Sequence, residues 1–152
     1  MKTIARSLIL LLGTGCLLGC REANSPGTAP NPIVGTWFVE DAGAPFHQHM
    51  YVFNADGTMQ QANPDAGDPS TSDSDGKGIW VADGNRIRGK WMEITADRAT
   101  HKFVSRGELP FEIQVTGNAF MGTLSARFYD PSGKLLQDYP ASPITGKRLT
   151  LP

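Results

Sequence analysis

The stretch IVGTWFVE, residues Ile33 to Glu40, opens the part of the chain that has the composition of a folded domain. From here onward, short runs of alternating apolar and polar residues are separated by turn residues, a pattern typical of antiparallel β-structure. A tryptophan at the start of the first strand can fill one closed end of such a structure. Gly35, two residues before Trp37, leaves room for neighbouring backbone. The stretch therefore predicts the first strand of a closed β-structure.

Four turns divide the rest of the sequence into hairpins. They are Asn54–Gly57, Ala82–Asn85, Thr116–Asn118 and Asp130–Gly133. Asp-Gly and Gly-Asn pairs supply the positive φ values that tight hairpins demand. We count eight to ten strands, the last over Ile144–Leu151, and interpret Trp91–Lys102 as strand, turn and strand. Successive hairpins without a long crossover predict an all-β, antiparallel up-and-down meander, and closing it into a barrel removes the exposed edges.

Gly35-Thr36-Trp37 resembles the Gly-x-Trp motif on the first strand of lipocalins and the wider calycin group. In that family an arginine on the last strand typically lies across the indole in a cation–π contact. Arg148, in TGKRLTL, stands at the matching place. The resemblance implies a small lipocalin-like barrel closed at one end by Trp37 and Arg148. The second and third lipocalin signatures are not recognisable, so the shorter bacterial lipocalin-like domains are the better analogy.

The first nineteen residues have the features of a signal peptide. Lys2 and Arg6 form a positive n-region, and Leu8–Leu18 is an apolar segment too short to span a bilayer as a stable helix. Leu17-Leu18-Gly19-Cys20 resembles the lipobox of bacterial lipoproteins. In that family the peptide is cut before the cysteine, whose sulfur and new amine are acylated. An ordinary secretory signal is the alternative, and Cys16 is a weaker second lipidation candidate.

The resemblance to lipoproteins implies a location at the cell envelope. Cys20 becomes a lipid anchor in the membrane and Cys16 leaves with the peptide, so the folded part has neither a disulfide nor thiol chemistry. Residue 21 is Arg rather than the Asp of an inner-membrane retention signal, which favours the outer membrane, facing the periplasm, if the source is Gram-negative. Residues 20–32 then form the lipidated cysteine and a flexible tether, which spans on the order of 20 Å, and residues 33–152 form one barrel domain.

The charge of the chain excludes one class of partner. Removing residues 1–19 takes away Lys2 and Arg6, so the mature chain has 14 − 2 = 12 basic and 15 acidic residues and a net charge of 12 − 15 = −3. The basic residues are scattered singly, so no footprint for nucleic acid is present. We expect a monomer without a cofactor.

His47-Gln48-His49 is the most suggestive polar pair. On a strand, residues two apart share a face, so both imidazoles, Tyr51 and Phe53 would point the same way. If that face is interior, they form a polar and aromatic wall near one mouth of the barrel; if it is exterior, the histidines are solvated. A metal or haem site would need a third ligand, and His101 is the only other imidazole. We therefore predict ligand contacts and no metal.

Further candidates for the ligand site are aromatic or cationic. Trp80 and Trp91 are able to line a cavity. On their predicted strand, Arg127 and Tyr129 lie on the face opposite Leu124, Ala126 and Phe128. If this polar face is interior, Arg127 and Tyr129 could contact the anionic head group of a ligand. Residues 63–77 form a long polar loop with four aspartates, which we interpret as a solvated lid, with a weak cation site near Asp73 as the alternative.

Three hypotheses about function follow. The first is a lipid-anchored barrel that binds a small apolar or amphipathic molecule in its mouth. The second is a calycin-like isomerase or cyclase in which a histidine converges inside the barrel with Tyr51 or Arg127. The third is an interaction module that presents the acidic loop to an envelope partner. No nucleophile motif or P-loop is present, so the first hypothesis is preferred.

Overall fold

A computed structural model describes residues 30–62 and 68–152. The predicted signal peptide, Cys20 and most of the tether lie outside the described residues, as do residues 63–67 of the acidic loop. The described part of the chain contains no helix long and apolar enough to cross a membrane.

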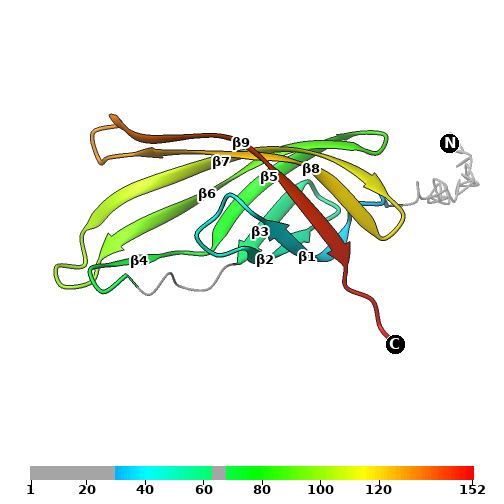
Figure 1. Ribbon diagram of the computed structural model, residues 1–152, viewed down its shortest axis with the longest axis horizontal. Helices are drawn as coiled ribbons and strands as arrows, with labels where there is room; N and C mark the ends of the chain where they lie inside the picture. Colours follow the sequence, from blue (N-terminus) through cyan, green and yellow to red (C-terminus); the bar gives the residue numbers. More distant parts are fainter. Residues whose placement is uncertain (1–29, 63–67) are drawn as a thin grey trace, which may run out of the picture.

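The described residues form nine antiparallel strands, eight of which close into a barrel (Figure 1). The strands are β1 (Gly35–Asp41), β2 (Gln48–Phe53), β3 (Thr58–Ala62), β4 (Thr71–Asp73), β5 (Gly76–Asp83), β6 (Arg86–Asp97), β7 (Phe103–Thr116), β8 (Ala119–Tyr129) and β9 (Leu135–Arg148). The barrel order is β1, β2, β3, β5, β6, β7, β8 and β9, and β9 pairs back onto β1. The extra strand, β4, pairs with β6. The prediction of an all-β, antiparallel closed barrel is thus confirmed.

Two details of the predicted strands are corrected. Part of the predicted loop over residues 63–77 is β4, whose three residues pair with the far end of β6, and the loop's last two residues begin β5. The segment after Asp130–Gly133 and the predicted last strand are one continuous 14-residue strand, β9. β9 is long because it pairs along β8 in its first part and reaches β1 only in its last part.

Trp37 closes one end of the barrel. Its side chain is fully buried, its ring centroid lies 5.1 Å from that of Phe120, and its Nε1 donates a hydrogen bond of 2.7 Å to the Ile33 carbonyl. The guanidinium of Arg148 lies 4.3 Å from the indole centroid and donates to the carbonyls of Val34 and Pro32. Hydrogen bonds from Arg148 therefore hold Pro32 and Val34 at this end of the barrel.

The opposite end is open because the strands differ in length. β1, β2 and β3 have seven, six and five residues, whereas β6, β7, β8 and β9 have 12, 14, 11 and 14. In Figure 1 the β6–β7 and β8–β9 hairpins extend at the left well past β1, β2 and β3. Near their tips these hairpins extend past β1, β2 and β3, and β4 pairs with the end of β6 there. All described strands and the core lie between residues 33 and 148, so a chain that begins after Cys20 contains the whole described fold.

Candidate functional site

A cavity of about 460 Å³ occupies the open end of the barrel, opposite Trp37. Its apolar walls come mainly from the long strands: Leu109 of β7, Leu124, Ala126 and Phe128 of β8, and Tyr139 of β9. Trp91 of β6 lines its inner part, and the β1–β2 connection at Gly43–Pro45 borders its rim. The cavity therefore lies between the extended hairpins and the short strands.

Polar side chains enter this cavity from four strands. They are Asp41 at the end of β1, His49 on β2, Gln61 on β3 and Glu93 on β6. Each occupies an inward position of an alternating run, because Trp37, Val39 and Asp41 share one face of β1, and Trp91 and Glu93 share one face of β6. All four are buried. The site is thus an apolar cup with a polar inner wall.

The two histidines of the His-Gln-His segment do not share a face. His49, Tyr51 and Phe53 are buried in the interior, but His47 is exposed. β2 begins only at Gln48, and His47 belongs to the turn before it, where its carbonyl accepts a hydrogen bond from the Asp41 N–H. The rule that residues two apart share a face holds only within a strand. His47 therefore does not line the cavity.

The tautomer of His49 follows from its neighbours. The Gln61 side-chain oxygen accepts a hydrogen bond of 3.1 Å from the Gly76 N–H, so its amide nitrogen faces His49 Nδ1, 3.1 Å away. That nitrogen donates, and Nδ1 must accept, which leaves the ring proton on Nε2. Burial lowers the pKa of His49 below its ordinary 6.5, so the ring is neutral at pH 7.

Three buried donor atoms at this end have no hydrogen-bond partner of normal geometry among the described residues. They are Nε2 of His49, the hydroxyl of Tyr51 and Nε1 of Trp91. His49 and Trp91 line the cavity, and Tyr51 lies beside both, with ring centroids at 6.5 and 6.4 Å. Burial raises the pKa of Tyr51, so its hydroxyl keeps its proton, although a weak hydrogen bond from the Trp91 indole N–H opposes the rise. Unpartnered buried donors are uncommon in folded proteins.

The two carboxyl groups in the cavity differ in environment. Asp41 accepts hydrogen bonds from the Gly43 N–H at 2.9 Å and from the Ser142 hydroxyl at 3.3 Å. Glu93 has no hydrogen bond or ion pair with any described residue. Burial, and then the negative charge of Asp73, raise the pKa of Glu93 from 4.5 to about 7. Glu93 is therefore partly protonated at neutral pH.

Three other predicted ligand residues lie away from the cavity. Trp80 is buried nearer the closed end, where its Nε1 donates to the carbonyls of Asn54 and Thr58. Arg127 is on the outer surface, with its Nε 3.4 Å from an Asp138 carboxylate oxygen. Tyr129 is half-buried outside the cavity, where the Arg106 guanidinium lies 4.8 Å from its ring centroid.

Arg127 and Tyr129 are outside because the apolar face of β8 is the inner one. Leu124 and Phe128 line the cavity, and irregular pairing between Leu124 and Ala126 brings Ser125 to its wall as well. An anionic head group inside the barrel would therefore not meet Arg127. The sequence alone did not say which face of β8 is the inner one, and in the structure it is the apolar face.

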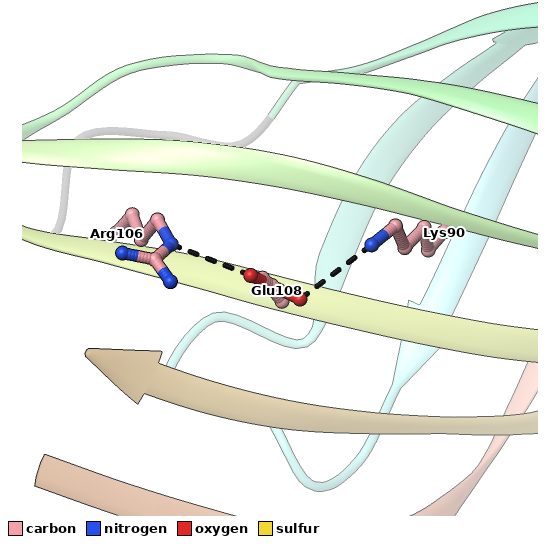
Figure 2. Close-up of polar contacts among 3 residues, drawn as sticks. All are labelled: Lys90, Arg106 and Glu108. Carbon is pink, nitrogen blue, oxygen red and sulfur yellow. Dashed lines mark hydrogen bonds and ion pairs between the residues drawn. The ribbon is translucent and has the colours of Figure 1, made fainter. Parts of the chain in front are cut away.

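The cations of the neighbouring strands lie on the outer surface. Figure 2 shows Glu108 of β7 between Lys90, 3.5 Å from one carboxylate oxygen, and Arg106, 3.3 Å from the other. Arg86 and Glu112 form a further outer pair at 2.6 Å. None of the described residues that line the cavity is Lys or Arg. The interior at this end thus contains carboxyl groups without a cation.

Neither His101 nor the alternative cation site near Asp73 forms a metal site among the described residues. His101 is exposed in the turn between β6 and β7, with a φ of 57°. Among the described residues, no group of three or more His, Cys, Asp or Glu side chains is arranged to hold a metal ion.

A scan against protein-family models and searches of curated proteins and of solved structures gave no match for this chain. Asp41, Gln61 and Glu93 were not among the predicted ligand residues. The sequence signal that could have identified such residues is a charged residue at an apparent inward strand position, such as Glu93, two residues after Trp91.

Proposed function

We propose that the protein is a lipid-anchored, lipocalin-like barrel that binds a small apolar or amphipathic molecule at its open end. The observation that supports this most directly is the cavity of about 460 Å³, which has apolar walls and a few buried polar groups. Pockets for small molecules typically measure about 300–1,000 Å³ and combine these two features. The contact of Arg148 with Trp37 supports the lipocalin-like assignment.

The position of the first described residues supports a cavity that faces away from the membrane. The first described residues are held at the closed end, where Asn31 donates a hydrogen bond to the Gly84 carbonyl and Arg148 donates to the Pro32 carbonyl. The cavity opens at the opposite end. A barrel anchored through Cys20 would then present its mouth to the periplasm of a Gram-negative cell.

The anchor is tested separately from the cavity. The mature chain should carry acyl groups on Cys20 and sediment with membranes, because three acyl chains hold a protein far more firmly than one. Cys20→Ser should remove the added mass and release the barrel from the membrane fraction. An unmodified Cys20 in the mature chain, measured by mass spectrometry, would contradict this part of the proposal.

Filling the cavity should abolish binding. The chain from residue 21 should enhance the fluorescence of N-phenyl-1-naphthylamine, a neutral apolar probe, in a saturable way. Ala126→Trp places an indole on the cavity wall and should weaken probe binding at least tenfold, by roughly 1.4 kcal/mol or more. Thr123→Trp, on the outer face of the same strand, is the matched control and should leave binding unchanged.

Equal probe affinity in the parent chain, Ala126→Trp and Thr123→Trp would show that the probe binds elsewhere. Circular dichroism melts of the three proteins would confirm that each is folded when it is titrated.

An enzyme that uses the same cavity is the second candidate, because Glu93 has a pKa of about 7. A carboxyl group with that pKa accepts and returns protons readily at neutral pH. The two functions differ in what happens to the bound molecule. If molecules extracted from the parent chain and from Glu93→Gln are chemically the same, the function is binding; if only the parent yields a product, it is catalysis.

A further inference from the structure

We propose that the cavity selects molecules that carry a positively charged nitrogen on an apolar body, with Glu93 as the counter-ion. This inference rests on the proposed binding function and names the class of ligand. Glu93 is only 8% exposed, lines the cavity, and has no hydrogen bond or ion pair with any described residue. A buried carboxylate is costly unless it is paired, so a ligand cation would supply the missing partner.

The groups that face Glu93 are acidic or neutral on every side. Asp73 of β4 is close enough to raise the pKa of Glu93, and Asp41 of β1 lies in the same cavity. On β7, the residue paired with Glu93 is Gly107, which has no side chain. The cationic Arg106 next to it contacts Glu108 on the outer surface instead. Tyr139 of β9 also lines the cavity and has no positive charge.

The β2 groups near Glu93 do not change this balance. Burial lowers the pKa of His49 and raises that of Tyr51, so both are neutral at pH 7. An anionic head group would add a further negative charge to a cavity whose charged groups are Asp41 and Glu93. A cation, in contrast, meets charges of opposite sign and the rings of Trp91 and Tyr139, whose faces attract ammonium groups.

The N–H groups of His49 and Trp91 refine the ligand class. Near them among the described residues are only the Phe46 carbonyl for His49 and the Tyr51 hydroxyl for Trp91, neither in normal hydrogen-bond geometry, so Nε2 of His49 and Nε1 of Trp91 can still donate to an oxygen acceptor on the ligand. A neutral hydroxyl, ether or carbonyl oxygen satisfies them without adding negative charge. We therefore infer an amphipathic amine or quaternary ammonium compound that also contains an oxygen acceptor.

Binding of a permanent cation should strengthen as the pH rises. The cation pairs with the ionised form of Glu93, whose pKa is about 7. About one tenth of this carboxyl is ionised at pH 6 and about nine tenths at pH 8, so the apparent affinity should rise roughly tenfold. Protonation of His49 would disfavour a cation only at pH values below its lowered pKa, so it acts in the same direction.

Displacement of N-phenyl-1-naphthylamine tests this with three ligands of equal chain length. The chain from residue 21 is titrated with decyltrimethylammonium, decanoate and decanol, each below its micellar concentration, at pH 6 and pH 8. At pH 8 the cation should displace the probe at a concentration at least tenfold lower than decanoate does. Its affinity should fall about tenfold at pH 6, whereas that of decanol should stay constant.

Two variants make the result specific to Glu93. Glu93→Gln should still bind the probe and decanol, but it should lose both the preference for the cation and its pH dependence. Glu108→Gln removes a carboxylate from the outer face and should keep both. If decanoate binds as well as the cation, or Glu93→Gln keeps the preference, the charge inference is overturned while binding stands. If neither the probe nor decanol binds the parent chain, the binding function and this inference both fail.

Discussion

Replacing Trp37 with alanine should lower the free energy of unfolding by about 3–5 kcal/mol, the range for truncation of a large buried aromatic side chain. Trp37 is fully buried and packs on Phe120 at 5.1 Å. Alanine would also leave the Ile33 carbonyl without the indole donor and remove the face over which Arg148 lies. Because β1 and β9 pair at this point, the loss acts on the contact that closes the barrel.

The measurement is urea denaturation followed by far-ultraviolet circular dichroism, which does not depend on the tryptophan that is removed. Phe38→Ala is the matched control, because Phe38 is the next residue along β1 and is 43% exposed on the outer face. It should cost about 1 kcal/mol or less. Trp37→Phe, which keeps a ring but not the N–H, should fall between the two. Similar losses for Trp37→Ala and Phe38→Ala would refute the role of Trp37 in closing the barrel.

The architecture could be predicted because its signals are local. Positive φ values at Gly84 and Gly117, of 58° and 59°, are what the Asp-Gly and Gly-Asn turns require. Alternation in short runs then gives antiparallel strands, and consecutive hairpins give a meander. These signals depend only on neighbours in the sequence, so they can be interpreted without knowledge of the tertiary structure.

The cavity was harder to predict because it depends on which face of each strand turns inward. On β8, alternation separates Leu124 and Phe128 from Arg127 but does not say which set is buried. Closure of the barrel decides this, and the irregular pairing at Leu124 and Ala126 further alters which residues reach the wall. The cavity also exists because β6 to β9 are longer than β1 to β3. No single sequence motif encodes this difference in strand length.

Glu93 illustrates the same limit for the candidate site. Its position two residues after Trp91 places the two side chains on one face of a strand, but the sequence does not reveal that Asp73 lies nearby. Nor does it show that the neighbouring cations, Lys90 and Arg106, are used on the outer surface by Glu108 (Figure 2). The raised pKa of Glu93 is a property of the packed barrel.

Glu93→Gln should stabilise the ligand-free protein at pH 8 and leave it nearly unchanged at pH 4. The native pKa of Glu93, about 7, exceeds its ordinary value of 4.5. The native state therefore binds more protons than the unfolded state between these pH values, and the free energy of unfolding falls as the pH rises through that window. The loss reaches at most about 3.5 kcal/mol at pH 8, because 7 − 4.5 = 2.5 and one pKa unit corresponds to about 1.4 kcal/mol.

The comparison must separate Glu93 from His49, whose lowered pKa has the opposite effect. His49 contributes stability that is present above pH 6.5 and is lost as the pH falls through its lowered pKa. Urea denaturation at pH 4, 6 and 8 of the parent chain, Glu93→Gln and Glu108→Gln isolates the Glu93 contribution as the parent–variant difference at each pH. A difference that is constant with pH, or equal for the two variants, would refute the raised pKa.

A carboxylate that destabilises the empty barrel at pH 8 is itself an argument for a ligand. An ionised Glu93 without a partner lowers stability, and a bound cation that pairs with it restores that stability through mass action. Decyltrimethylammonium should therefore raise the melting temperature of the parent chain more at pH 8 than at pH 6. In Glu93→Gln, which has no charge to neutralise, the rise should be smaller and independent of pH.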